Sequence, residues 1–565
     1  MNKRCLSVFL LLVVFCTGVL ASAARQDPKG ERRAVSQTAT PTTSPAATSP
    51  SPAQCSQASP SPTPSRGPAR ADTTKTLAEL QMRIAQILRK PELQAAMVGI
   101  KVASLDTGRV LFEQNAKKLL RPASNMKLYT VSAALDRLSP DFRFTTSVFA
   151  DAKPDAAGVI HGNLTIYGRG DPSIAARFNK GNYFKGIDDL ATRISGAGVK
   201  RVEGDLVGDE TYFVGPQYGS GWDWEDLQWW YGAEVSALTV NDNALDLCIK
   251  PGAQVGVPAS VTTGPPDPLL TIVNHVKTGP KGSKRELTVH RGLNDNTLEV
   301  SGTIPLGDRG YTGGIGISHP ALLFVYLLRT ALGQLGVTVS GQSRTKGAVN
   351  QALLTAGATL TTATGAAAPK TSGSVEIASM QSPPLSIVAA NTLKPSQNLY
   401  TEIILRTLGK MAVSSGLSSA RTSEFAGIEV VKAFLKEAGL NPDSLVLSDG
   451  SGLSRNDMVT AEASVRLLTY MSNHKYATAL RDALPIAGVD GTLRNRLKGT
   501  VAENNVRAKT GTLASATSLS GYVTTAAGEK LVFSIMVNNY PSDVEPREVC
   551  IDPIAVLLAS FAGRP

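Results

Sequence analysis

Hydrophobic residues recur along this chain in two distinct patterns. A spacing of three to four residues, which is typical of amphipathic helices, marks segments toward both ends of the folded part. The helices predicted in this way cover residues 77–88, 121–135, 384–393, 398–410, 424–438 and 546–561. Alternating apolar and polar residues predict a hairpin over 98–113, which turns at Gly108, and strands at 520–524 and 530–538.

The alternating pattern dominates the middle of the chain. Short strand-like segments follow one another between Gly and Pro turns, at 144–149, 163–167, 270–273, 287–290 and 298–304, and 319–335 is helical. This texture predicts largely antiparallel β modules over residues 136–377. We therefore expect one α/β domain, built from residues 73–135 and 378–565, with a β-rich region inserted into it.

The amino end has the pattern of a secretory signal. Lys3 and Arg4 precede an apolar run at 5–20, which small residues follow at 21–24. The run is shorter than the ~20 apolar residues of a membrane-spanning helix, although an uncleaved anchor stays open. We expect a signal peptide at 1–23 and a disordered linker, rich in Pro, Ser and Thr, at 24–72. An exported protein follows, periplasmic or in the cell envelope, which contacts a membrane at most through its N-terminus.

Composition places the chain among globular proteins and gives little support to a polyanionic partner. The 565 residues are 42% hydrophobic and 18% charged, and the net charge is +11. Beyond residue 72 there are 49 basic and 43 acidic side chains, with no Arg/Lys-rich run among aromatics, so nucleic acid is not expected. The three cysteines after the signal, Cys55, Cys248 and Cys550, predict no metal site and leave a Cys248–Cys550 bond open.

The first candidate for chemistry is the pair Ser124 and Lys127, at the start of a predicted helix. Residues i and i+3 share a helix face, so the lysine amine can reach the serine hydroxyl. A protonated lysine is no base, so such a site must lower the lysine pKa by burial, by a second cation or by the positive end of the helix. Ser-x-x-Lys alone is a weak motif, because it recurs at 343–346 and 472–475.

Two further motifs strengthen the case for this pair. Ser396-x-Asn398 opens a predicted helix, and Lys509-Thr510-Gly511 precedes a predicted strand. With Ser124-x-x-Lys127 they form, in the right order, the motif set of serine β-lactamases and penicillin-binding proteins. Second copies at 454–456 and 277–279 lack this combination of order and context.

From about Leu77 to its end the chain resembles the low-molecular-mass class C penicillin-binding proteins, which are D-alanyl-D-alanine carboxypeptidases of the peptidase S13 type. The blocks at 168–173, 231–243, 448–456 and 484–493 also look like this family. The long interval between Ser124 and Ser396 fits as well, because the family inserts two extra domains there. The resemblance implies an α/β catalytic domain with the serine β-lactamase/DD-peptidase fold, interrupted by a β-rich insertion of two smaller domains.

The resemblance also implies roles for the motif residues. Ser124 is the expected nucleophile, which attacks the carbonyl between the two terminal D-alanines, and Lys127 the expected general base. Ser396 and Lys509 would pass the proton to the leaving amine. Asn398 would bind the substrate amide and Lys127.

Further binding roles follow from the same resemblance. The N–H groups of Ser124 and Thr512 would form an oxyanion hole, and Thr510 and Thr512, with Lys509 and next to Gly511, would hold the terminal carboxylate. In the family an Asp of the inserted region binds the amino group of diaminopimelate, and Asp171 is the candidate here. A turn Asp before Pro172 is the alternative for Asp171.

The predicted function is an exported serine-type D-Ala-D-Ala carboxypeptidase that acts on peptidoglycan stem peptides and is acylated by β-lactams, with endopeptidase activity left open. No cofactor is expected. Two alternatives remain, a serine β-lactamase and a catalytically silent wall-binding protein. The inserted region counts against the first, and the intact motifs count against the second.

Overall fold

The computed structural model describes residues 73–265, 267, 269–347 and 374–564. The predicted signal at 1–23 and linker at 24–72 lie outside these residues. Among the helices described, none is long and apolar enough to span a membrane.

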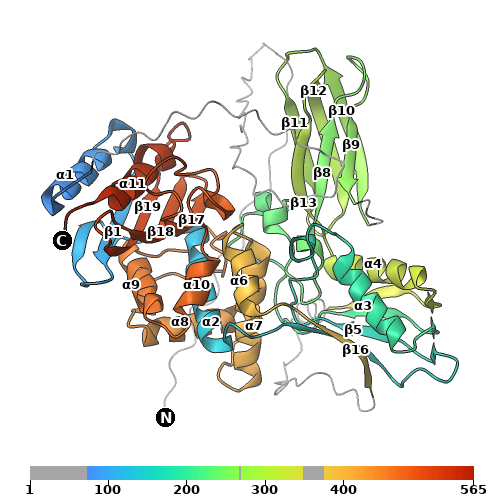
Figure 1. Ribbon diagram of the computed structural model, residues 1–565. Helices are drawn as coiled ribbons and strands as arrows, with labels where there is room; N and C mark the ends of the chain where they lie inside the picture. Colours follow the sequence, from blue (N-terminus) through green and yellow to red (C-terminus); the bar gives the residue numbers. More distant parts are fainter. Residues whose placement is uncertain (1–72, 266, 268, 348–373, 565) are drawn as a thin grey trace, which may run out of the picture. The chain divides into compact units, whose positions relative to one another are not determined.

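A five-stranded antiparallel sheet joins the two ends of the described chain (Figure 1). Its order is β17 (Arg507–Leu513), β18 (Ala516–Thr524), β19 (Lys530–Asn538), β1 (Met97–Ser104) and β2 (Val110–Gln114). The predicted hairpin and the predicted strand at 530–538 are therefore confirmed, and they pair with each other through β1 and β19. β17 lies at an edge of the sheet, with β18 as its partner strand.

Both faces of this sheet are covered by helices because its strands alternate apolar residues to either side. Phe533 and Ile535 of β19 belong to a core with α1 (Leu77–Leu88) and α11 (Asp552–Ser560). Val532 and Met536 belong to the larger core on the other face. That core contains α2 (Met126–Leu138), α6 (Leu385–Leu393), α7 (Asn398–Ser414), α8 (Ser423–Glu437), α9 (Ala461–Ser472) and α10 (Ala477–Ala483).

The predicted carboxyl-terminal helix is divided. A wide helical turn, η9 (Arg547–Ile551), precedes α11, whose first turn contains Pro553. Proline lacks the N–H of a regular helix, which fits a break just before it. Cys550 in η9 is buried and has a free thiol, so it does not pair with Cys248.

Among its described residues, the inserted region contains four sheets and two α-helices. Its five-stranded sheet has the order β15 (Ser343–Lys346), β7 (Leu206–Asp209), β5 (Leu164–Tyr167), β3 (Thr145–Ala150), β16 (Val375–Gln381). The three-stranded sheets are β14 (Thr338–Val339)–β6 (Arg201–Val202)–β4 (Val159–Ile160), β13 (Tyr311–Gly316)–β8 (Ala244–Lys250)–β9 (Ser260–Gly264) and β10 (Thr271–Gly279)–β12 (Thr297–Pro305)–β11 (Glu286–Arg291). The helices are α3 (Lys185–Gly196) and α4 (Pro320–Gln334).

The expectation of largely antiparallel pairing in this region holds for five of the ten strand pairs among its described residues, and the other five are parallel. β7 pairs in parallel with both β5 and β15, and β10 pairs in parallel with β12. Parallel neighbours need a long crossover, and α3 lies in the chain between β5 and β7. The alternating pattern identifies the strands but does not show whether neighbouring strands run in the same direction or in opposite directions.

The sheet β17-β18-β19-β1-β2 and the helices that cover it form the domain that we call the helical domain. The inserted region leaves and rejoins this domain at one place. β3 and β16 form an antiparallel pair at its two ends. Beside them the Ser382 N–H donates to the Phe144 carbonyl at 2.9 Å, and the Phe144 N–H donates to Ser382 Oγ at 3.0 Å. We call these two antiparallel segments, which are joined at Phe144 and Ser382, the neck.

Candidate active site

Ser124 and Lys127 lie at the start of α2, as the sequence pattern predicts. Ser124 belongs to a short helical turn, η2 (Ala123–Asn125), and is partly exposed. Ala123 before it has a positive φ of 47°, a conformation that is costly for a residue with a Cβ and is often found at functional sites. Lys127 Nζ is 2.9 Å from Ser124 Oγ.

The amine of Lys127 is held by two further oxygen atoms. Asn398 Oδ1 is 2.5 Å from Nζ, and the Ser451 carbonyl oxygen is 2.7 Å away. The Asn398 amide is oriented by its Nδ2, which donates to the Tyr231 carbonyl at 2.8 Å, so Oδ1 faces the lysine. A neutral amine has two N–H groups, and these two oxygens only accept. Its lone pair therefore faces Ser124 Oγ.

Burial shifts Lys127 toward this neutral form. The side chain is 0% exposed, and loss of hydration lowers the pKa of Lys127 to about 7. The nearby carboxylates Asp449, Glu402 and Asp457 act in the opposite direction and raise that pKa. The arrangement gives a lysine that can take up a proton near neutral pH.

A second lysine and serine lie in contact at the start of α7. Lys509 Nζ donates to Ser396 Oγ at 2.8 Å and to the Thr510 carbonyl at 2.9 Å. Burial, and then the charge of Lys127, hold the pKa of Lys509 well below its usual value. Ser396 has a positive φ of 65°, just before the cap of α7 at Gln397.

The edge strand β17 packs directly against the Ser124 turn. The Lys509-Thr510-Gly511 motif lies inside β17, whereas the sequence predicted it just before a strand. Ser518 of the neighbouring β18 donates from Oγ to the Pro122 carbonyl at 2.7 Å. A Cβ on Gly511 would lie 2.2 Å from Ser518 Oγ and 2.5 Å from the Pro122 oxygen, so only glycine fits this close approach.

The two threonines of this motif have different surroundings. Thr510 is buried, and its Oγ1 donates to Thr492 Oγ1 at 2.7 Å. Thr512 is exposed on β17. Of the two hydroxyls expected to hold a carboxylate, only that of Thr512 lies open to solvent.

Asp171 is not brought into this cluster by any hydrogen bond between described residues. It is 2% exposed, and its Oδ1 accepts from the N–H of Ser173 at 2.8 Å and from the Ser173 hydroxyl at 2.7 Å. Its Oδ2 is buried without a hydrogen-bond partner, and burial raises the pKa of Asp171 to about 6. The Oδ1 contacts are those of a turn, the alternative given above, and Oδ2 stays without a partner among the described residues, so the substrate contact remains a prediction.

Three contributors to the cluster were missed from the sequence. Ser451 and Tyr231 act through backbone carbonyls, and every residue has a carbonyl, so no residue pattern identifies them. Asp449 lies in the 448–456 block, whose two glycines and one aspartate suggest a structured loop without assigning it a contact. The second Lys-Thr-Gly copy, by contrast, ends strand β10 of the inserted region.

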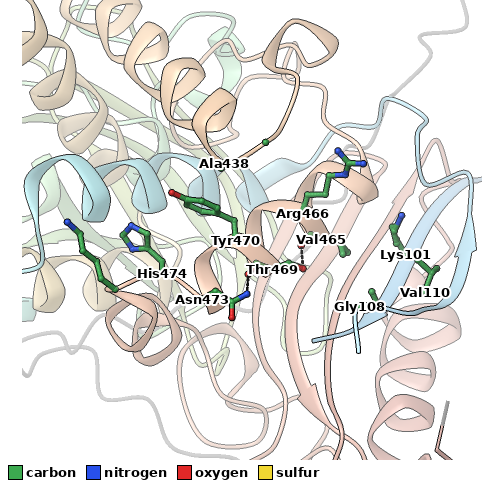
Figure 2. Close-up of a pocket in the computed structure, with 13 residues that line it drawn as sticks. Lys101, Gly108, Val110, Ala438, Val465, Arg466, Thr469, Tyr470, Asn473 and His474 are labelled. Atoms are coloured by element: carbon green, nitrogen blue, oxygen red, sulfur yellow. Dashed lines mark hydrogen bonds between the residues drawn. The ribbon is translucent and has the colours of Figure 1, made fainter. Parts of the chain in front are cut away.

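A separate groove of about 780 Å³ lies behind α9, between its side chains and strands β1 and β2 (Figure 2). Three of its charged side chains are in ion pairs: Lys101 with Glu113 at 3.0 Å, Arg466 with Glu462 at 3.0 Å, and His474 with Asp136 at 3.0 Å. The Lys475 amine lies over the Tyr476 ring, 4.9 Å from its centre. None of the motif residues lines it. In the part of the chain that is described, no three His, Cys, Asp or Glu side chains gather as a metal site.

Comparison with known proteins gives consistent relatives. The family model described as D-Ala-D-Ala carboxypeptidase 3 (S13) matches residues 80–352 and 344–561. The D-alanyl-D-alanine carboxypeptidase of Actinomadura sp. (strain R39) is 35% identical over 510 residues, which cover 88% of each chain. The crystal structure of penicillin binding protein 4 from Haemophilus influenzae aligns with a TM-score of 0.69 at 22% identity, over 84% of this chain and 97% of that one. A second structure of that protein, complexed with a β-lactam, aligns over the same shares with a TM-score of 0.64 at 21% identity. These structures confirm the α/β fold predicted from the motifs.

Proposed function

The chain belongs to the D-Ala-D-Ala carboxypeptidase 3 (S13) family of peptidases, and from this premise we propose that it is an exported serine-type enzyme that removes the terminal D-Ala from peptidoglycan stem peptides. The observation that carries the proposal is the geometry of Lys127. Its amine is buried and bonded to two pure acceptors, and its third direction faces Ser124 Oγ at 2.9 Å. This is the geometry of a base that activates a nucleophile.

In the first step Lys127 takes the proton of Ser124 while Oγ attacks the carbonyl carbon of the scissile D-Ala-D-Ala bond. The carbonyl π electrons move to oxygen, and a tetrahedral intermediate forms. When the C–N bond breaks, the leaving D-Ala amine takes up a proton and the peptidyl group stays on Ser124 as an ester. Water then attacks that ester, which releases the shortened peptide and restores the serine hydroxyl.

Ser396 and Lys509 supply the proton for the leaving amine. The Ser396 hydroxyl is 2.8 Å from Lys509 Nζ, so Ser396 gives its proton to the leaving amine and is reprotonated through Lys509, which passes on the proton that Lys127 took from Ser124. The charge of Lys127 also lowers the pKa of Lys509, because two buried ammonium groups repel each other, so a proton on one lysine disfavours a proton on the other. Both effects favour proton transfer near neutral pH.

The N–H groups of Ser124 and Thr512 hold the negative oxygen of the intermediate. Such donors are typically worth about 2.7–4 kcal/mol each in the transition state. Gly511 of β17 packs against Ser518 and the Pro122 carbonyl, which are themselves joined at 2.7 Å, and this close approach of β17 to the Ser124 turn supports this role for the strand. The exposed Thr512 hydroxyl and Lys509 then receive the terminal carboxylate of the substrate.

β-Lactams acylate the same serine in this proposal, as the β-lactam complex of the related Haemophilus influenzae protein suggests. The β-lactamase alternative needs a second base for fast deacylation, a Glu that activates water in class A enzymes. The chain has one Glu-x-x-Leu-Asn segment of that kind, at 437–441. Glu437 ends α8 and pairs at the surface with Arg137, in the last turn of α2, at 2.6 Å. Ser124 precedes the other end of that helix, so Glu437 is not placed to activate water at the acylated serine. We therefore propose a peptidase whose β-lactam adduct is hydrolysed slowly.

Export rests on the amino-terminal pattern at 1–23. The periplasm or cell envelope is where stem peptides occur, which agrees with the proposed substrate. Endopeptidase cleavage of cross-links uses the same chemistry at a D-Ala carbonyl whose leaving amine belongs to a neighbouring stem peptide.

The test is mass spectrometry of the exported protein after incubation with benzylpenicillin, followed by identification of the modified peptide. The wild-type protein is expected to gain one stable penicilloyl group on Ser124 and to release D-Ala from a peptide ending in D-Ala-D-Ala. Ser124→Ala should do neither. A Ser124→Ala protein that still forms the adduct or still releases D-Ala contradicts the proposal, and rapid release of penicilloate supports a β-lactamase.

A further inference from the structure

The two oxygens that fix the Lys127 amine are both connected to one segment of the inserted region. Asn398 is held by the Tyr231 carbonyl at 2.8 Å. Ser451 belongs to a loop built around Asp449, and Asp449 accepts from the Trp222 indole N–H at 2.7 Å. Trp222 and Tyr231 are nine residues apart in the insertion, whereas Asn398 and Asp449 belong to the helical domain.

Asp449 organises the loop that carries the Ser451 carbonyl. The carboxylate is 0% exposed and accepts from five donors. These are the backbone N–H groups of Gly452 at 2.6 Å, Ser454 at 3.0 Å and Leu453 at 3.1 Å, the hydroxyl of Ser451 at 3.0 Å and the indole of Trp222 at 2.7 Å. A carboxylate that receives several donors of one loop fixes its conformation. The direction of the Ser451 carbonyl therefore depends on Asp449.

Trp222 is itself held against the helical domain. Two residues earlier, the Ser220 N–H donates to Glu424 Oε1 of α8 at 2.9 Å. Further back, Arg406 of α7 donates to the Pro216 carbonyl at 2.6 Å and to the Tyr218 carbonyl at 3.2 Å. These contacts give the indole N–H a fixed position from which to hold the Asp449 carboxylate.

We propose that Asp449 and Trp222 are positioning residues for Lys127, through which the inserted region directs the lysine lone pair at Ser124. Asp449 sets the Ser451 carbonyl that takes one N–H of the amine, and Trp222 sets Asp449. The inference rests on the proposed function, because it requires Lys127 to act as a base. It adds that the inserted region, through Trp222, helps to set the catalytic geometry, although neither Trp222 nor Asp449 contacts the reacting atoms.

The two residues also affect the protonation of Lys127 in a predictable direction. The Asp449 charge raises the lysine pKa, and an acceptor on an ammonium group stabilises the charged form. Removal of either effect leaves the pKa of Lys127 lower. The acid limb of the pH profile, where Lys127 becomes protonated and inactive, should then move to lower pH.

The test compares Trp222→Phe and Asp449→Asn with the wild type, using kcat/KM from pH 5 to 9 and the rate of penicillin acylation. Trp222→Phe keeps the ring and removes one hydrogen bond, so we expect a loss of about 3- to 10-fold, in kcat more than in KM. Asp449→Asn keeps the shape and removes the charge, so we expect a loss of about 100-fold and a shift of the acid limb by about one pH unit downward. Trp222→Phe should shift the limb in the same direction by less.

Trp224→Phe is the matched control. Trp224 is 65% exposed and its indole makes no hydrogen bond to a described residue, so the pH profile should stay in place. If Trp222→Phe has wild-type kinetics and an unmoved acid limb, the inference is wrong, and this test holds even when Asp449→Asn fails to fold. The inference is also wrong if Trp222→Phe and Trp224→Phe lose the same amount of activity. If Ser124→Ala remains active, the proposed function itself is wrong.

Discussion

Lys509 and Ser396 are in contact at 2.8 Å although 113 residues separate them in the chain. Lys509 lies on the edge strand β17 and Ser396 just before α7, so the contact joins the sheet to the helices of this domain beside Ser124. Because Lys509 is fully buried, loss of hydration and then the charge of Lys127 hold its pKa well below the usual value, which suits a group that passes a proton on.

Replacement of this buried amine should therefore be costly for catalysis. We expect Lys509→Met to lower kcat/KM for D-Ala release by roughly 10²- to 10³-fold, since the proton relay through Ser396 is lost. Lys277→Met changes the same motif letters in the inserted region, where Lys277 is exposed on β10. It should leave kcat/KM unchanged, and equal losses in both variants would contradict the assignment of the motif.

The pH dependence follows from Lys127. Its pKa is lowered to about 7, and the base must be neutral, so kcat/KM should be level above about pH 7 and fall tenfold per unit below it. The measurement is the acylation rate by a β-lactam between pH 5 and 9, under conditions in which circular dichroism shows no unfolding. A rate independent of pH over this range would show that no group with such a pKa controls the step.

Asn398→Asp offers a test of opposite sign. A carboxylate in place of an amide oxygen 2.5 Å from Lys127 Nζ favours the ammonium form and should raise the lysine pKa by about 1–3 units. The acid limb moves upward, and activity at pH 7 falls about tenfold or more but recovers at higher pH. Asn456→Asp, in the second Ser-x-Asn copy, is exposed and should not move the limb.

Gly511 tests how closely β17 must approach the Ser124 turn. The Cβ of Gly511→Ala would overlap Ser518 Oγ and the Pro122 carbonyl, so the strand must shift. We expect about 1–3 kcal/mol of lost stability together with a large loss of acylation, measured by thermal unfolding and by penicillin binding. Gly196→Ala, at the end of α3, meets no atom within 4 Å. It should keep full activity.

Local spacing identified the parts of the site that lie close in the chain. Ser124 and Lys127 were expected on one helix face, and the structure places their side chains 2.9 Å apart. The distant motifs at Ser396 and Lys509 could be joined to them only through the known motif set, because no periodic pattern encodes a contact between segments so far apart. For Asp171 the resemblance suggests a substrate contact, which stays a prediction; the structure shows a buried carboxylate whose Oδ1 closes a turn with Ser173.

The remaining parts of the site have no side-chain signature. The carbonyls of Ser451 and Tyr231 act through backbone atoms, and their directions depend on the tertiary structure. Parallel pairing in the inserted region escaped prediction for a similar reason, since alternation specifies the faces of a strand and not its direction. The strand and helix positions themselves, such as β1, β19 and α4, follow their hydrophobic patterns closely.

The neck has a consequence for how this protein can vary. Since the chain departs at Phe144 and returns at Ser382 in direct hydrogen-bonded contact, a short turn there would restore an uninterrupted polypeptide. The inserted region is nevertheless not freely exchangeable, because Phe213, Val235 and Ala237 belong to the core that contains α2, α6 and α7. In particular, a shortened protein without the stretch from Pro216 to Tyr231 would keep its nucleophile and lose the contacts that orient Lys127.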